Sequence, residues 1–142
     1  MKQTFKNILL ASLATILPLS AQAATLTVQA ATFAGLNYTN TAASTSDTFP
    51  NDGRTFLIFV NANASSRTLT IAANATSRPG FGSISTPSTV VTLPGSGTNG
   101  GLAVVGPFPT ARFNNPTTGR VTYTLDNATS MSVSAIRLTR YQ

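Results

Sequence analysis

The sequence predicts an all-β protein, an antiparallel β-sandwich or jelly roll of about eight short strands preceded by a hydrophobic N-terminal segment. Three observations carry this prediction. Helical periodicity is absent after residue 24, short alternating or β-branched runs recur instead, and Gly, Pro, Asn and Ser separate these runs. Regularly spaced strands with turn residues between them are typical of sandwiches and jelly rolls rather than of βαβ units.

The first 23 residues have the features of a secretory signal peptide. Lys2 and Lys6 form a positively charged start, an apolar stretch follows at 8–19, and the triplet AQA at 21–23 has the small-x-small pattern that signal peptidase accepts. The apolar stretch is shorter than the roughly 20 residues that a spanning helix needs. We therefore expect cleavage after this triplet, with an uncleaved N-terminal helix as the alternative, and a single β-sandwich domain over 24–142.

Eight segments of this domain have the pattern of strands. In chain order they are 25–33, 36–41, 54–61, 67–73, 89–93, 101–106, 120–125 and 131–139. Turn-rich segments join several of them, at 62–66, 93–101, 113–119 and 126–130. The irregular segment 74–87 is expected to form a long loop, and the low-complexity residues 40–46 are expected to form a flexible connection.

The strand at 54–61 is apolar on both faces. Because side chains alternate along a strand, Phe56, Ile58 and Val60 point one way while Leu57 and Phe59 point the other way. A two-layer sandwich covers only one face of each sheet, so a loop, the N-terminal segment or another subunit must cover the second face. This pattern predicts association, with Leu57 and Phe59 as candidate subunit contacts.

A second unusual stretch is GPFPTARFN at 106–114. Pro107 and Pro109 stop a strand and fix an extended corner. That corner presents Phe108 and Phe113 around Arg112, an arrangement that suits either a plug of the core or a subunit contact. We therefore add these three residues to the candidate contacts.

The domain offers little for catalysis or metal binding. Residues 24–142 contain no His, Cys, Glu or Lys, so a conventional metal site, a Ser–His pair and a Cys nucleophile are excluded. The acidic side chains are Asp47, Asp52 and Asp126, and we expect Asp47 and Asp52 to be solvated loop residues. No catalytic, metal or cofactor site is predicted, and the protein is predicted not to be an enzyme.

The charge pattern does not fit a nucleic-acid-binding protein. Seven Arg and three Asp give the domain a net charge of +4, and the arginines are scattered singly without an aromatic platform.

In NDGRT, at 51–55, Asp-Gly is a turn dipeptide and Arg54 is placed to pair with Asp52 or Asp47. A carbohydrate-binding module is also disfavoured, because the domain has no Trp and only three Tyr.

Three segments resemble a known family. FPNDGRTFLIFVNANASSRTLTIA at 49–72, GPFPTARFNN at 106–115 and SMSVSAIRLTR at 130–140 are similar to segments of small head decoration, or cement, proteins of tailed phages. The resemblance implies a jelly-roll domain, commonly trimeric, that sits on a capsid lattice protein and reinforces it. It also implies a virion location and a structural, non-enzymatic role.

The N-terminus departs from this family, because a virion protein assembled in the cytoplasm does not need a secretion signal. The second interpretation is therefore a secreted or periplasmic β-sandwich protein of adhesive or filament-forming type, with no membrane attachment after cleavage. Both interpretations expect a homo-oligomer and no bound cofactor. They differ in location and in the larger assembly that the domain joins.

Overall fold

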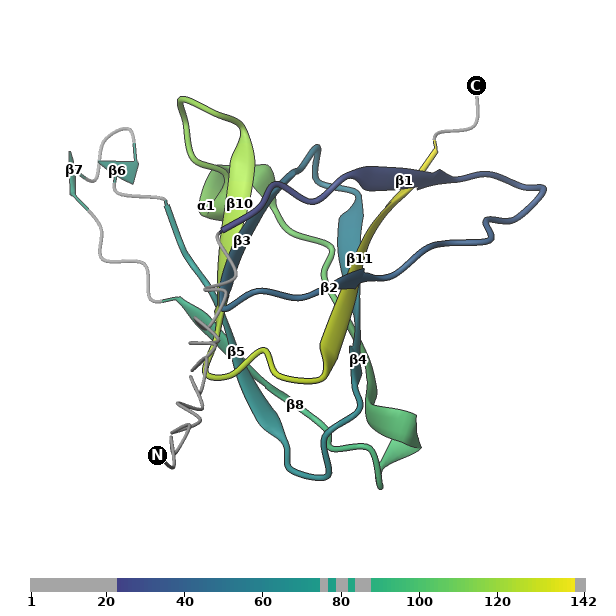
Figure 1. Cartoon of the computed structure of the whole chain (residues 1–142). Helices are drawn as coiled ribbons and strands as arrows, with labels where there is room; N and C mark the ends of the chain where they lie inside the picture. Colours follow the sequence, from purple (N-terminus) through teal and green to yellow (C-terminus); the bar gives the residue numbers. More distant parts are fainter. Residues whose placement is uncertain (1–22, 75–76, 79–81, 84–87, 140–142) are drawn as a thin grey trace, which may run out of the picture.

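The computed structural model describes residues 23–74, 77–78, 82–83 and 88–139. Within these ranges the chain is an all-β sandwich of two sheets, as the sequence predicts (Figure 1). The signal-peptide prediction for 1–22 lies outside the described residues.

The first sheet is built around the last strand of the chain. Its strands run in the order β1–β11–β4–β9, and β2 also pairs with β11. They are β1 (Val28–Ala31), β2 (Thr41–Ala42), β4 (Thr55–Asn61), β9 (Leu102–Val105) and β11 (Met131–Leu138). The pairs with β11 are antiparallel except for β1, which runs parallel to it.

The second sheet has the order β3–β10–β5–β8. Its strands are β3 (Ser46–Pro50), β5 (Arg67–Ile71), β8 (Thr89–Leu93) and β10 (Arg120–Leu125), and all of them pair antiparallel. The small hairpin of β6 (Ser77–Arg78) and β7 (Gly82–Ser83) belongs to neither sheet. When the other eight strands from β2 onward are renumbered 1 to 8 in chain order, the two sheets have the strand orders 1-8-3-6 and 2-7-4-5. This is the jelly-roll arrangement.

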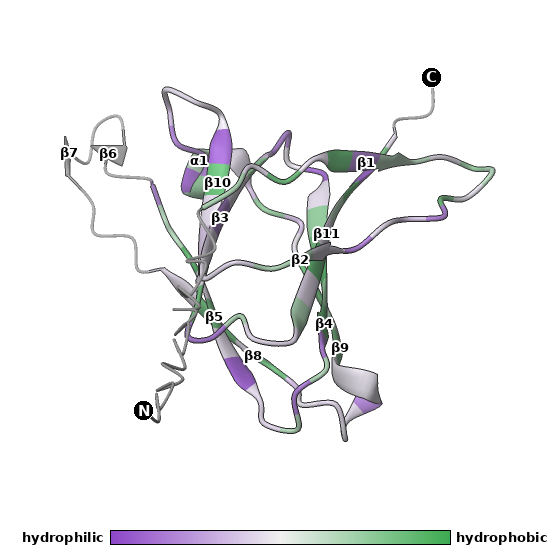
Figure 2. Ribbon diagram, viewed as in Figure 1, coloured by the Kyte–Doolittle hydropathy of each residue, from purple (hydrophilic) through white to green (hydrophobic). Residues whose placement is uncertain are grey.

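Large apolar side chains from both sheets fill the space between them. Phe49, Leu69 and Tyr123 come from one sheet and Leu57 and Phe59 from the other, and all five are fully buried. The Phe59 and Tyr123 rings meet edge to face, with their centroids 5.4 Å apart. Figure 2 shows apolar residues along the strands of both sheets and polar residues in many of the connections.

Most of the predicted strands are confirmed, but several local predictions are wrong. The segment 36–41 contributes only Thr41 to a strand, and Ser46–Pro50, at the end of the expected flexible connection, is β3. The corner after β9 contains a helical turn, α1 (Thr110–Phe113), and a short 3-10 turn, η1 (Asn99–Gly101), precedes β9. Strand β3 was not predicted because it lacks the usual alternation of apolar and polar residues. Its two buried positions are Asp47 and Phe49, so a polar residue occupies an inward position.

Candidate assembly surface

The corner at 106–114 is a plug of the core rather than a subunit contact. Phe108 and Phe113 are both buried, and Phe108 packs against Phe113 and Phe49 with ring centroids 5.9 and 5.2 Å apart. The Arg112 guanidinium lies 4.8 Å from the Phe113 ring centroid and donates to the Thr89 hydroxyl at 3.1 Å. These contacts join the corner to β3 and β8, which corrects the interpretation of these three residues as subunit contacts.

Leu57 and Phe59 also belong to the core. Both side chains are 0 % exposed. Their cross-strand neighbours, Ala135 and Val133 of β11 and Val105 and Ala103 of β9, belong to the core or pack against it, so the two side chains lie on the inward face of the sheet. The prediction that these two residues form a subunit contact is therefore corrected. The opposite side of the same strand is the outward one.

The outward side of β4 and β9 is an apolar surface, which we call the β4–β9 outer face. On β4 its side chains are half-buried, and on β9 they are open to solvent: Leu102 is 46 % exposed and Val104 62 % exposed. The register places Val104 beside Ile58 and Leu102 beside Val60. The outer face consists of Phe56, Ile58, Val60, Leu102 and Val104, none of which is charged.

The chain covers the neighbouring part of this sheet with its own residues. On the outward side of β11, Ser134 is buried and its hydroxyl donates to Thr39 O at 2.7 Å and lies 2.6 Å from Asn40 Oδ1. Ile136, which pairs with Phe56, is buried as well. The connection between β1 and β2 therefore shields β11, whereas the β9 side of the outer face stays open.

Strand β9 is the last strand of its sheet among the described residues. Its sequence, LAVV, contains no Pro and no charge, the features that commonly protect an edge strand from pairing with another chain. The open part of the outer face thus ends at a strand edge that is chemically suited to pairing.

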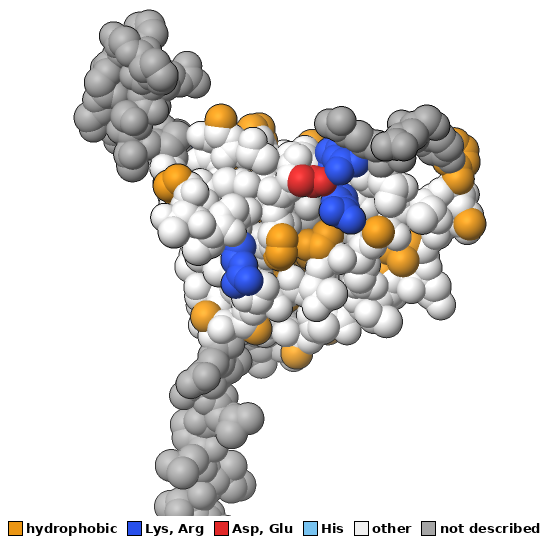
Figure 3. All heavy atoms as spheres, turned by 90° about the horizontal axis from the view of Figure 1, so that it is seen from above, with side chains coloured by type: hydrophobic (Ala, Val, Ile, Leu, Met, Phe, Trp, Pro, Cys, Tyr) orange, Lys and Arg blue, Asp and Glu red, His pale blue; other side chains and the backbone are white. Residues whose placement is uncertain are grey.

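The turn before β4 forms an ion pair, as the sequence suggested. The Asp52 carboxylate accepts from the Arg54 guanidinium at 2.5 Å and lies 3.9 Å from that of Arg137. Figure 3 shows an acidic group flanked by basic ones on a surface that is otherwise mostly uncharged. Burial raises the pKa of Asp52, but the hydrogen bonds and charge of Arg54 outweigh this effect and lower it overall. The pair is exposed at the surface, so it is a structural contact of modest strength.

Asp47 is not the solvated loop residue that the sequence suggested. It is 1 % exposed, on β3, and its carboxylate accepts from the Tyr123 hydroxyl at 2.6 Å and from the Ser44 hydroxyl at 2.5 Å. The backbone N–H groups of Ser44 and Ala24 donate to it at 3.1 and 2.8 Å. Burial raises the pKa of this carboxyl, but the hydrogen bonds from Ser44, Tyr123 and Ala24 lower it more.

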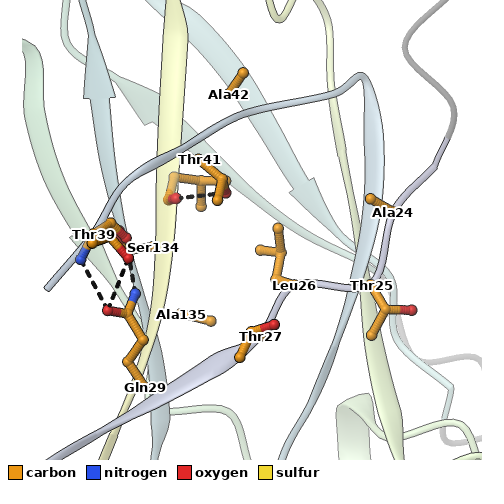
Figure 4. A pocket seen from close by; sticks show the side chains of 11 residues that line it. Ala24, Thr25, Leu26, Thr27, Gln29, Thr39, Thr41, Ala42, Ser134 and Ala135 are labelled. Carbon is orange, nitrogen blue, oxygen red and sulfur yellow. Dashed lines mark hydrogen bonds between the residues drawn. The ribbon is translucent and has the colours of Figure 1, made fainter.

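A shallow hollow of about 240 Å³ lies between the N-terminal segment, β2 and β11 (Figure 4). Alanine, threonine and other uncharged side chains line it. Its most prominent polar group, the Gln29 amide, donates to Thr39 O at 2.8 Å and accepts from Thr39 N at 2.9 Å. The Gln29 amide is thus already paired within the chain.

The described residues contain no group of three or more His, Cys, Asp or Glu that is able to hold a metal ion. Over the same ranges no helix is long and apolar enough to cross a membrane. No family model, curated protein or solved structure matches the chain. The β4–β9 outer face combines exposed apolar side chains with a strand edge. The sequence contained its signal in the alternation of 102–105, which places Leu102 and Val104 on the same side.

Proposed function

We propose that this chain is a structural, non-enzymatic domain that associates with copies of itself through the β4–β9 outer face and stabilises a larger assembly. The observation that carries the proposal is the open, uncharged apolar surface of Leu102 and Val104 next to an unprotected strand edge. Contiguous exposed apolar surface on a soluble domain commonly marks an interaction site.

A second copy of the chain suits this surface. A two-fold contact brings the same patch of both subunits together, so a patch without charge meets no repulsion there. The exposed edge of β9 adds unpaired backbone groups that are able to extend the sheet into a neighbour. Three copies around an axis, as the resemblance to decoration proteins implies, would use the same apolar surface against a different part of the neighbour.

The resemblance to small phage decoration proteins supports a capsid lattice as the larger assembly. The segments that carry it are structural in this fold: 49–72 contains β4, 106–115 contains the plug, and 130–140 contains β11. In this setting the domain binds the surface of the lattice and strengthens it. The virion is then its location.

A secreted or periplasmic assembly of adhesive or filament-forming type is the second candidate. The observation that favours it is the signal-peptide pattern of residues 1–23. Its AQA triplet ends directly before Ala24, whose carbonyl oxygen accepts from Thr48 N of β3. The mass of the protein purified from its native host separates the two settings. A chain that begins at Ala24 supports the secreted setting, and a chain that retains residues 1–23 contradicts it.

Self-association is tested by light scattering of the chain from Ala24 onward over a wide concentration range. We expect an oligomer for the unchanged chain and a monomer for Val104→Asp, because the substitution buries a carboxylate in the contact at a cost of several kcal/mol. Val90→Asp is the matched control, since Val90 is 64 % exposed on β8, an edge strand of the other sheet, and Val104 is 62 % exposed.

Both variants should keep the circular dichroism of the unchanged protein, since both side chains already face solvent. A monomeric unchanged chain at every concentration would contradict the proposal. So would equal loss of association in the Val90 and Val104 variants, because the contact would then not belong to the β4–β9 outer face.

A further inference from the structure

The buried Asp47 carboxylate receives one of its hydrogen bonds from the residue that follows the predicted cleavage site. Ala24 N donates to Asp47 Oδ1 at 2.8 Å. In the uncleaved chain this nitrogen is a neutral peptide N–H. Hydrolysis of the 23–24 peptide bond adds the hydroxyl of water to the Ala23 carbonyl carbon and a proton to the Ala24 nitrogen. The free amine then takes a further proton from solvent near neutral pH.

We propose that cleavage after Ala23 converts this contact into an ion pair between the α-ammonium group of Ala24 and Asp47, so that processing fixes the N-terminal segment onto β3. The inference rests on the secreted setting proposed above. It assigns a role to Asp47 that the assembly surface does not use.

The backbone next to the Ala24 nitrogen is anchored by residues that cleavage leaves in place. Thr48 N donates to Ala24 O at 2.9 Å, and Leu26 N donates to Thr48 O at 2.8 Å. The Leu26 side chain is buried in the core cluster. Figure 4 shows Ala24, Thr25 and Leu26 in succession along one side of the hollow. These contacts hold the new terminus beside Asp47 once the peptide bond is broken.

The surroundings of the carboxylate suit an added positive charge. Asp47 is 1 % exposed, and its other donors, Tyr123 and Ser44, are neutral. Hydrogen bonds between ionised groups are roughly twice as strong as neutral ones. A like charge lies nearby: the Arg120 guanidinium donates to the Thr25 hydroxyl at 2.9 Å and opposes the ammonium from one residue away. Because Asp47 is in direct contact and Arg120 is not, attraction outweighs this repulsion.

The composition of the cleaved chain makes the ammonium directly measurable. Residues 24–142 contain no Lys and no His, so the α-amine of Ala24 is the single amine, and an amine-reactive ester labels it alone. It is also the main group expected to titrate between about pH 6 and pH 9.

The test compares three recombinant proteins: a chain that starts at Ala24, the same chain with Asp47→Asn, and a chain that starts at Ala23. Each is released from a fusion by a protease that leaves no extra residue. The labelling rate of the amine is measured against pH, and thermal unfolding is measured at the same pH values.

For the chain from Ala24 we expect labelling at pH 7 to be about tenfold slower than for Asp47→Asn, with the midpoint of its pH profile shifted upward. A raised amine pKa contributes stability that is fully present below the unfolded value of about 7.7 and is lost as pH rises through the folded value. The Tm should therefore fall by several degrees between about pH 8 and pH 10. The chain from Ala23 should show no such fall.

Equal pH midpoints in the Ala24 and Ala23 chains would overturn the inference. Labelling that is slow at every pH, with an unshifted midpoint, would also overturn it, because that result means steric shielding alone. If Asp47→Asn does not fold, the comparison with the Ala23 chain still decides. All three proteins are made without the native secretion route, so this test does not depend on whether cleavage occurs in the host. Cleavage is tested by the mass of the protein from its native host, and assembly is tested by light scattering.

Discussion

At the scale of single residues, Asp47 and Tyr123 join two neighbouring strands of the second sheet. The Tyr123 hydroxyl, on β10, donates to the carboxylate on β3 at 2.6 Å, and both residues are buried. Burial and the adjacent Asp47 raise the pKa of Tyr123, so the hydroxyl keeps its proton and remains a donor. A protonated phenol next to a charged carboxylate makes one of the stronger kinds of hydrogen bond.

Tyr123→Phe should lower the free energy of unfolding by about 2 kcal/mol, measured by urea denaturation. The change removes one charge-assisted hydrogen bond and leaves the ring packing against Phe59 intact. Tyr38→Phe is the matched control, because Tyr38 lies at the surface, and it should change stability by less than about 0.5 kcal/mol. Equal effects of the two changes would contradict the importance of the Asp47 contact.

The sequence did not reveal this pair of residues. Asp47 follows three small polar residues at 44–46, a context that is typical of a solvated loop. Its burial depends on partners up to 76 positions away in the chain, and no local pattern records that pairing. Tyr123, by contrast, lies in the clean alternation of 120–125, which correctly predicts an inward side chain.

At the scale of elements, the turn before β4 and the corner around α1 form one unit. The Asn51 amide donates to Phe108 O at 2.8 Å and to Asn114 Oδ1 at 2.7 Å. In return, the Asn114 amide donates to Asn51 O at 2.8 Å. The FPNDGRT and GPFPTARFNN segments, more than 40 residues apart in sequence, therefore stabilise one another.

A double-mutant cycle should detect this coupling. Asn51→Ala should cost about 1–3 kcal/mol of unfolding free energy, because it leaves buried polar groups unpaired. Once Asn51 is replaced, Asn114→Ala should cost at least about 0.5 kcal/mol less than it does alone. Asn63→Ala is the control. Asn63 lies on the β4–β5 turn and its amide donates to Thr129 O, before β11, so this change should add independently to Asn51→Ala. Additive effects for Asn51 and Asn114 would show that turn and corner are separate units.

The strands themselves were largely predictable. Alternation and β-branched residues give the bounds of β8 and β10, and give β4, β5, β9 and β11 to within two residues at each end. The direction in which β4 faces was not predictable, because both of its faces are apolar. Pairing with β11 and β9, whose inward residues are Val133, Ala135 and Val105, decides it. The candidate contacts chosen on β4, Leu57 and Phe59, therefore lie on its inward side.

At the scale of the whole molecule, the shortage of ionisable groups determines how stability depends on pH. Residues 24–142 contain neither His nor Glu, so few side chains titrate between about pH 5 and pH 7. Asp47 and Asp52 both have pKa values below the ordinary value of 3.8, and the buried Asp47 is expected to dominate the acid limit. A lowered pKa contributes stability that is present above the unfolded value and is lost as pH falls through the folded value.

Urea denaturation between pH 2 and pH 7 should therefore give a plateau above about pH 5 and a decline that begins near pH 4. Asp52→Asn should change the decline little, because the Asp52 ion pair is exposed and screened by solvent. Asp47→Asn should lower the plateau and flatten the decline, since the buried carboxylate that must be protonated is gone. A decline of unchanged steepness in Asp47→Asn would mean that another group controls acid unfolding, and that Asp47 does not link the N-terminal segment, β3 and β10 in the way its hydrogen bonds indicate.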